Sequence, residues 1–376
     1  MAAGCLVRQE RLRALLSNLG LDAAVFHDAN EIQYFTGHLS PDVLGDLATH
    51  PAVLFVETNG RSLLISDSDV GEALVDERVS YEPHLLHTRN GDLLRQAAAI
   101  LRSCLGGKSL ARIGWRAEGL PHVIATAIAE TVAPDEWVAI DEQIADMERR
   151  KDPDEVETLQ EAIACNLAAY DAAQLAIAPR VTELVILQAA QLSATLRAGQ
   201  QVYHSGDYRA GEFGGPARDR ALVKHELYII DAWTQYCGYW SDLCRTFAID
   251  EPTNVQCEVY GHIKDILLSV PEQLNPGMHG TDIWTWMDGR IREHPHLRET
   301  GLTHHAGHGV GLRAHEGPDL NRDRGDVLRA GDVVSVEPGA YTPELRAGIR
   351  LENTFLITET GCELLSNYPL SLERQV

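Results

Sequence analysis

Two aspartates interrupt apolar stretches in the second half of the chain. Asp231 ends the run LYIID, and Asp242 lies eleven residues later, at the start of SDLCRTFAI. The two stretches are typical of a hairpin with a turn through residues 235–239, so both carboxylates would lie on neighbouring strands. An ionised carboxylate buried in an apolar strand is costly unless a cation compensates it.

Two glutamates near the C-terminus pose the same problem. Glu337 follows the apolar run VVSV and precedes Pro338, and Glu352 lies in the apolar stretch IRLENTFLI. Arg350, two residues before Glu352, would lie on the same face of one strand. From there it could orient the Glu352 carboxylate, or it could form an ordinary ion pair.

His308 is flanked by glycines in HHAGHGVG, where missing side chains let the backbone and a ligand approach closely. Taken singly, each acid could be a turn or cap residue, and a lone histidine is more often structural. Taken together, four carboxylates balance the charge of two divalent cations, and the imidazole adds a neutral ligand. We therefore predict a two-metal site, and two such ions can activate a shared water for hydrolysis. Its predicted ligands are Asp231, Asp242, His308, Glu337 and Glu352.

The elements that must position these residues begin with a helix. Asp152 can cap it, with Pro153 at its first position and Glu155 three residues beyond the cap. A second helix is predicted over residues 182–197, ended by Gly199. Helical patterns over 256–270 and 281–294 and strands in DVVSVEPGAY and GIRLENTFLIT follow. The second domain, residues 146–376, is therefore predicted to be an antiparallel sheet covered by helices.

Residues 1–145 alternate helical and strand patterns, which predicts a smaller α/β domain. The predicted strands are LDAAVFH, AVLFVET, RSLLIS and ARIGW, and the predicted helices are the amphipathic start of the chain and RQAAAILRSCL. This half contains no nucleophile elbow, phosphate loop or dinucleotide fingerprint. We expect it to serve assembly and to wall the active site.

The composition bounds the function. A chain of 376 residues with 44% hydrophobic residues is long enough for about two domains. Its 55 acidic and 32 basic residues give a net charge of -23, which opposes binding to nucleic acid or anionic lipid. No secretory core or membrane span is apparent, so a cytoplasmic location is expected. The seven cysteines form no CxxC pair, which favours free thiols over disulfides or thiolate zinc.

Several of these stretches resemble a known family. In order, IIDAWTQYCGYWSDLCRTF, HHAGHGVG, VEPG and IRLEN are similar to the metal-ligand motifs of the pita-bread metallopeptidases, which include aminopeptidase P, prolidase, methionine aminopeptidase and the metal-free creatinase. LGLDAAVFHDANEIQYFTG resembles the opening of the creatinase and prolidase N-terminal domain. The resemblance covers nearly the whole chain. It implies an α+β pita-bread catalytic domain after a smaller α/β creatinase-like domain, and a homodimer.

The resemblance also implies roles for individual residues. Asp231 and Asp242 would hold one metal and His308 and Glu337 the other, with Asp242 and Glu352 bridging. Glu337 would also accept a proton from the attacking water. His315 would contact the scissile carbonyl or shuttle protons, and His304 would contact the substrate, as would Arg350. Oxygen-rich ligation with one nitrogen suits manganese, our first expectation, or cobalt, zinc or iron.

One departure from the family concerns the substrate. GEFGGPARDRALVKHELYIID resembles the family's HGxPxDR stretch, but Gly214 stands where that stretch has its histidine. In proline-directed peptidases this histidine helps to form the substrate pocket. His204 could substitute for it from the stretch VYHSGDYRAGEFGG, which is expected to be a loop, or the substrate could differ.

The leading hypothesis is a metal-dependent peptidase that cleaves the bond before proline, as an Xaa-Pro aminopeptidase or dipeptidase acting on short peptides. The second is hydrolysis or lysis of a non-peptide small molecule on the same fold, as in creatinase and compatible-solute hydrolases; Gly214 motivates it. The third is a catalytically silent binding module. Five intact predicted ligands argue against the third hypothesis.

Overall fold

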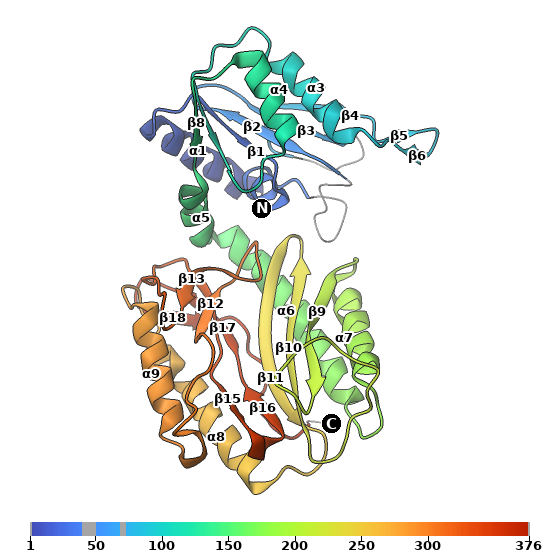
Figure 1. Cartoon of the computed structure of the whole chain (residues 1–376), viewed down its shortest axis with the longest axis vertical. Helices are drawn as coiled ribbons and strands as arrows, with labels where there is room; N and C mark the ends of the chain where they lie inside the picture. The colour runs from blue at the N-terminus through green and yellow to red at the C-terminus, as the bar shows by residue number, and fades with distance from the viewer. Residues whose placement is uncertain (1, 40–49, 68–72, 375–376) are drawn as a thin grey trace. The chain divides into compact units, whose positions relative to one another are not determined.

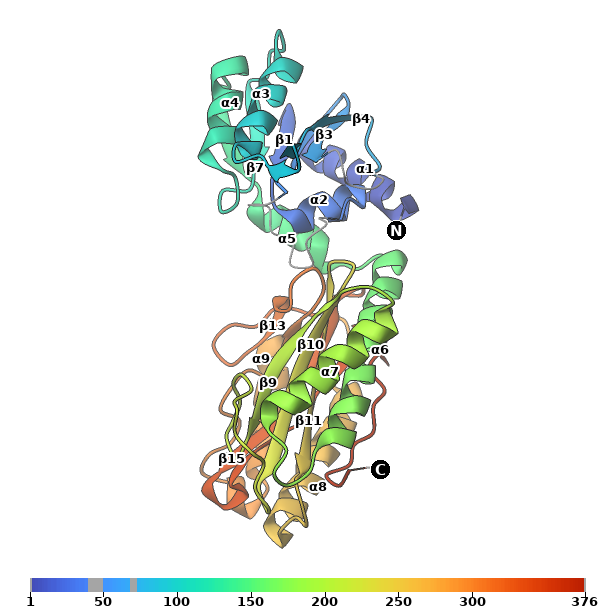
Figure 2. The same ribbon diagram turned by 90° about the vertical axis from the view of Figure 1, so that its right-hand side faces the viewer.

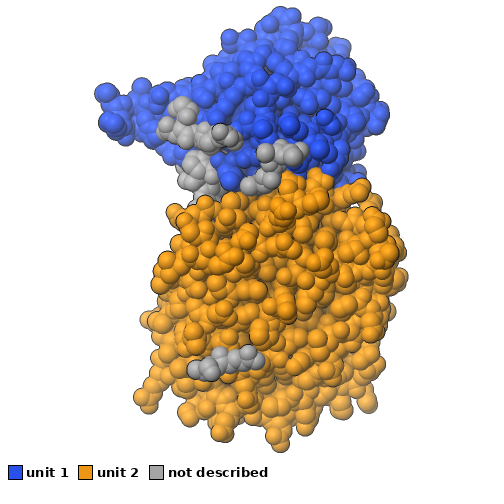
Figure 3. Space-filling view, turned by 180° about the vertical axis from the view of Figure 1, so that it is seen from behind, with its two compact units in different colours: residues 1–147 blue, residues 148–376 orange. Residues whose placement is uncertain are grey.

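The computed structural model describes residues 2–39, 50–67 and 73–374, and the chain divides into two compact units, residues 1–147 and 148–376 (Figure 3). All seven cysteines are free thiols, and Cys5, Cys165 and Cys244 among them are buried. No helix formed by the described residues combines the length and the hydrophobicity that a bilayer-spanning segment needs.

The first unit is built on a mixed sheet with the strand order β4-β3-β2-β1-β7-β8 (Figure 1). In the central strand β1, Ala23 and Val25 pack with α3 and α4, while Phe26 faces away and its ring contacts Phe35 of α2. Helices therefore cover both faces of the sheet (Figure 2). The elements are α1 (Ala2–Asn18), β1 (Ala23–Phe26), α2 (Ala29–Thr36), β2 (Val53–Glu57), β3 (Ser62–Asp67), β4 (Glu77–Tyr81), β5 (His84–Leu85), β6 (Thr88–Arg89), α3 (Leu93–Leu105), β7 (Arg112–Trp115), α4 (His122–Val132), β8 (Glu136–Ala139) and α5 (Asp141–Arg149).

The strands and helices predicted for this unit are all present. The edge strands β4 and β8 were not predicted, because an edge strand buries little of its surface and so has fewer apolar residues to mark it.

Two helices open the second unit, as predicted. Helix α6 (Pro153–Ala176) begins after Asp152, whose backbone N–H donates to the Glu155 carboxylate at 2.9 Å in a capping box. Helix α7 (Glu183–Ala198) ends at Gly199, whose positive φ of 67° suits glycine. Both helices pack on the sheet β11-β10-β9 (Figure 2).

This sheet differs from the prediction in two places. Strands β10 (Leu227–Tyr236) and β11 (Tyr239–Ala248) are longer than expected, because the turn needs only Cys237 and Gly238. Both have positive φ, 46° and 79°, which is typical of a tight hairpin turn. The expectation of a loop over 202–215 is wrong for its first half, where β9 (Tyr203–Ala210) pairs with β10. Gly206 and Asp207, weak strand formers, conceal this strand in the sequence.

The second sheet has the order β13-β12-β14-β17-β18 and packs on α8 and α9 (Figure 1). Its elements and their neighbours are α8 (Asn254–Ser269), a 3-10 turn (Val270–Glu272), α9 (Gly280–Arg292), a 3-10 turn (Pro295–Leu297), β12 (Gly307–Gly309), β13 (Glu316–Leu320), β14 (Val333–Val336), β15 (Gly339–Thr342), a 3-10 turn (Pro343–Leu345), β16 (Ala347–Arg350), β17 (Asn353–Ile357) and β18 (Cys362–Leu364). Strands β15 and β16 form a separate ribbon. The predicted antiparallel sheet covered by helices is therefore present as two antiparallel sheets and a ribbon.

Candidate metal centre

The hairpin places Asp231 and Asp242 on one face. Ile230 and Ala232 belong to the core beneath α6 and α7, so Asp231 between them points to the opposite face. Asp231 pairs with Cys244, and Trp233 pairs with Asp242. The two aspartates are therefore diagonal neighbours on adjacent strands, as their eleven-residue spacing requires.

The second sheet contributes His308 and Glu337. Val334 and Val336 of β14 lie in the core with α8 and α9, so Ser335 between them faces away, and His308 of β12 is its cross-strand partner. Glu337 directly follows β14, and its backbone N–H donates to the Ala306 carbonyl at 2.9 Å.

Glu352 lies at a break between two strands, which corrects the prediction of one continuous strand. β16 ends at Arg350 after pairing with β15, and β17 begins at Asn353 and pairs with β14. At the crossing point the Glu352 N–H donates instead to the carbonyl of Cys244 at 3.0 Å, which holds this glutamate beside the hairpin.

The structure brings all five predicted ligands together. Three groups have potential ligand atoms within 4.8 Å of one another: Asp231, Asp242 and Glu352; His308, Glu337 and Glu352; and Asp242, His308 and His315. Glu352 is common to the first two groups, and Asp242 links the first to the third. Four of the five predicted ligands are no more than 6% exposed, and the Asp231 side chain is 14% exposed.

The donor set fits two divalent cations. Among the described residues, Asp242 Oδ1 and Glu352 Oε1 are buried without a hydrogen-bond partner. Burial and the neighbouring carboxylates raise the pKa of Asp242 and Glu337 well above their usual range, and burial, then Asp231, raises the pKa of Glu352 to about 8. Burial and His315 lower the pKa of His308 to about 3, which leaves the ring neutral. A cluster of carboxylates together with a neutral imidazole is a suitable ligand set for divalent cations.

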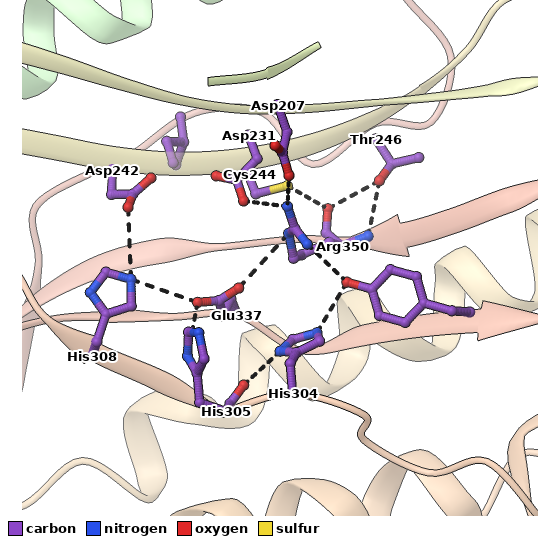
Figure 4. A network of polar contacts seen from close by, with 12 residues as sticks. Asp207, Asp231, Asp242, Cys244, Thr246, His304, His305, His308, Glu337 and Arg350 are labelled. Carbon is purple, nitrogen blue, oxygen red and sulfur yellow. Dashed lines mark hydrogen bonds and ion pairs between the residues drawn. The ribbon is translucent and has the colours of Figure 1, made fainter. Parts of the chain in front are cut away.

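Arg350 forms ion pairs with two aspartates of the hairpin sheet. Its Nη2 donates to Asp231 and, at 2.9 Å, to Asp207, while Nη1 donates to the Tyr341 hydroxyl at 3.1 Å (Figure 4). Its Nε lies 3.8 Å from Glu337. Of the two roles that the sequence left open for Arg350, these contacts are the ion pair rather than an orienting contact to Glu352, because the strand break turns the guanidinium toward the hairpin.

Three further histidines lie around the cluster. His315 is exposed, and a potential ligand atom of its ring lies within 4.8 Å of those of Asp242 and His308. His305, which was not predicted, has Nδ1 3.3 Å from Glu337. His304 is engaged at both ring nitrogens, by the His305 carbonyl at 2.7 Å and the Tyr341 hydroxyl at 3.0 Å.

These side chains line a pocket of about 650 Å³. Its lining includes every predicted site residue and also Asp207, Phe213, Trp233, Thr303, His305 and Tyr341. Asp207 lies on β9. Because the sequence did not predict this strand, it did not predict Asp207 as a pocket residue either. The alternation of buried and half-buried residues along 203–210 is the signal that could have revealed it.

The suggestion that His204 substitutes for the missing pocket histidine is wrong. Its ring is 3% exposed and lies 2.8 Å from both the Thr234 and the Tyr208 hydroxyls, on the core face of β9. Alternation along the strand places Asp207, three residues later, on the opposite face.

Two family profiles match the chain. The Creatinase/Prolidase N-terminal domain matches residues 8–149, and Metallopeptidase family M24 matches residues 157–359, which is more than half of the chain and includes all five predicted ligands.

The chain belongs to metallopeptidase family M24.

Its relatives agree with this assignment. The M24 chain is 25% identical to an uncharacterised peptidase of Bacillus subtilis, over 97% of this chain and 99% of that protein. It is 30% identical to an Xaa-Pro dipeptidase of Pyrococcus furiosus over 61% of this chain and 67% of that protein. Among solved structures, the prolidase of Pyrococcus horikoshii superposes with a TM-score of 0.78 at 21% identity, covering 97% of this chain and 99% of that one.

Membership in the M24 family gives the two units their names. The first is a creatinase-type N-terminal α/β domain, and the second is a pita-bread catalytic domain, as the resemblance implied. The M24 chain is a metallopeptidase-family hydrolase, and its family implies divalent metal ions and a peptide substrate.

Proposed function

We propose that this M24 protein hydrolyses the peptide bond before proline, with two divalent ions held by Asp231, Asp242, His308, Glu337 and Glu352. The observation that carries the proposal is the pair of ligand groups that share Glu352 around partnerless buried carboxylate oxygens. When bound, such ions supply a nucleophilic hydroxide and polarise the scissile carbonyl. Manganese is our first candidate, with cobalt, zinc or iron as alternatives.

Glu337 is the proposed proton acceptor. Its carboxylate lies in the pocket lining, between His305 and His308 and within 3.8 Å of Arg350. Arg350 keeps a positive charge beside it, which favours the ionised form needed to accept a proton.

His315 is the proposed contact to the scissile carbonyl. Its ring is exposed in the pocket, and the centroid of the His308 ring lies 3.8 Å away. His304 is less free for that role because Tyr341 engages its Nε2. We propose that His304 lines the substrate site in its present orientation and that Arg350 acts on the substrate through the network it organises.

Three aromatic rings support the choice of a proline-containing substrate. Phe213, Trp233 and Tyr341 line the same pocket, and the Phe213 and Tyr341 rings meet edge to face at a centroid distance of 5.4 Å. Such rings can pack on a compact apolar pyrrolidine. The names of two similar proteins, an Xaa-Pro dipeptidase of Pyrococcus furiosus and an X-Pro aminopeptidase of Thermotoga maritima, support the same substrate class.

A second candidate is hydrolysis or lysis of a non-peptide small molecule. It is favoured by Gly214, because no histidine stands there to help form a proline pocket.

The test is to purify the protein, quantify bound metal, and assay Gly-Pro, Ala-Pro-Pro and several non-peptide amides with manganese or cobalt. Cleavage of either proline peptide with about two metals per chain is the expected result. If neither peptide is cleaved, the proline assignment fails, and turnover of a non-peptide amide would then establish the second candidate.

We also propose that the protein is a homodimer, as the family resemblance implies. Light scattering coupled to size-exclusion chromatography tests this, since a chain of 41.4 kDa should elute with about twice that mass. A monomeric mass would contradict it.

A further inference from the structure

Asp207 adds a fifth carboxylate to the pocket, and its position is unusual. It stands directly opposite Asp231 in the pairing of β9 with β10. Like charges directly opposite each other in a sheet repel. Here Arg350 Nη2 donates to both carboxylates (Figure 4). The Gly215 N–H also donates to Asp207 Oδ1 at 2.7 Å. Asp207 is thereby held in place, yet its side chain remains 27% exposed.

The position of the Asp207 carboxylate requires a glycine at residue 214. A Cβ at residue 214 would lie 2.1 Å from Asp207 Oδ2, far closer than two such atoms can approach. Asp207 cannot simply move aside without losing both Arg350 and the Gly215 N–H. Any side chain at 214 and the carboxylate at its present place therefore exclude each other.

The carboxylate changes the charge of the pocket. Four ligand carboxylates balance two divalent cations, which leaves the positive charge of Arg350. Asp207 cancels that charge and occupies one N–H of Nη2, the one not directed at Asp231, which would otherwise be available to an anionic group. In a pocket of about 650 Å³, no bound substrate lies far from Asp207, so its charge changes the electrostatic energy of any substrate in the pocket.

We propose that Asp207, admitted by Gly214, makes this site select substrates that lack a free carboxylate beside the scissile bond. The inference rests on the proposed function and deepens it: amidated or extended proline peptides are preferred over free dipeptides. Without Asp207, the metal ions would balance the four ligand carboxylates, and Arg350 would keep an uncompensated positive charge. Such a pocket would instead favour the free carboxylate of a dipeptide.

The first experiment compares Gly-Pro with Gly-Pro-amide, which share a scissile bond and differ in one charge. The wild type should have the higher kcat/KM for the amide. Asp207→Asn keeps the side-chain volume and removes the charge, so it should shift the ratio of the two kcat/KM values toward Gly-Pro by about tenfold or more. Asp323→Asn, which removes one exposed charge outside the pocket, should leave the ratio unchanged. An unchanged ratio in Asp207→Asn overturns the proposal.

Calorimetric binding of proline and prolinamide to the metal-loaded protein gives a readout that needs no turnover. Prolinamide should bind more tightly to the wild type, and Asp207→Asn should lose that preference. If neither dipeptide is cleaved but this binding result holds, the proposed function fails and the charge selection stands. If neither protein distinguishes the two ligands, the charge selection fails.

A double-mutant cycle on the metal-free protein tests the steric coupling. Gly214→Ala should lower the Tm in the wild type and lower it much less in Asp207→Gly, because the clash is then absent. Backbone strain at residue 214 is common to both backgrounds and cancels. Additive Tm shifts would show that Gly214 does not admit Asp207.

Discussion

The Tyr341 hydroxyl donates a hydrogen bond to Nε2 of His304. The direction follows from the other ring nitrogen, since Nδ1 faces the carbonyl of His305 and must carry the proton. Burial, followed by the charge of Arg350, lowers the pKa of His304 to about 3, so the ring is neutral at pH 7. Arg350 in turn donates to the Tyr341 hydroxyl. The arginine thus orients a histidine of the pocket through one tyrosine.

Tyr341→Phe should lower kcat/KM about tenfold, because the loss leaves a buried Nε2 and an arginine N–H without their shared partner. Metal content should stay the same, since the hydroxyl touches none of the proposed ligands. Steady-state kinetics together with metal analysis check this. Unaltered kcat/KM would mean that the orientation of His304 is irrelevant to turnover.

Asp242→Asn should reduce bound metal from about two ions per chain to one or none and remove detectable turnover. Its Oδ2 lies 3.7 Å from Nε2 of His308, close to the roughly 3–3.5 Å between two ligands of one ion at about 2.1 Å each. Elemental analysis and peptide assays provide the measurement. Asp323→Asn on the exposed surface is the control and should retain both properties. Full activity in Asp242→Asn would refute the proposed centre.

The metal-free protein should lose stability as the pH rises from 7 to 9. Glu352 has a pKa of about 8 when folded against 4.5 as its ordinary value, so the folded state holds a proton that the unfolded chain has released. That stabilisation is complete below pH 4.5 and disappears as the pH passes 8. Glu352 alone accounts for an expected loss of about 1.4 kcal/mol between pH 7 and 9, and the raised pKa values of Asp242 and Glu337 change the stability in the same direction.

Chemical denaturation in a chelating buffer at pH 7, 8 and 9 measures this loss. The window lies above the ordinary pKa of His304 and His308, 6.5, so their titration does not contribute to it. Glu352→Gln should give a flatter profile. Identical profiles for the two proteins would show that Glu352 is not the titrating group.

Arg245→Lys should destabilise the protein by about 3 kcal/mol, because a lysine cannot replace the planar fork of a buried guanidinium. Arg245 is 1% exposed and binds the Glu352 carbonyl, the Asn353 side chain at 2.9 Å and the Tyr368 carbonyl at 2.8 Å. Urea unfolding of the metal-free protein measures the loss. The exposed Arg298→Lys is the matched control, and an equal effect in both variants would rule out this anchoring role.

Much of the site was predictable from local sequence. Apolar runs broken by Asp231, Asp242 and Glu337 mark costly acids, and their number suggests two cations without knowledge of the fold. Helix α6 was predictable because its capping residues are all local. The hairpin was predictable because apolar residues recur along both of its ten-residue strands.

Tertiary structure alone decided the partners of the charged groups. Glu352 lies between β16, which pairs with β15, and β17, which pairs with β14, and no local pattern encodes this change of pairing partner. This turn aims Arg350 at Asp231 rather than at Glu352. Asp207 lies in the pocket only because β9 pairs with β10. The need for a glycine at residue 214 becomes clear only from the structure, in which the Asp207 carboxylate fills the space that a Cβ would occupy. Residue types and spacing determined which groups could bind metal, whereas long-range strand pairing determined which charges meet.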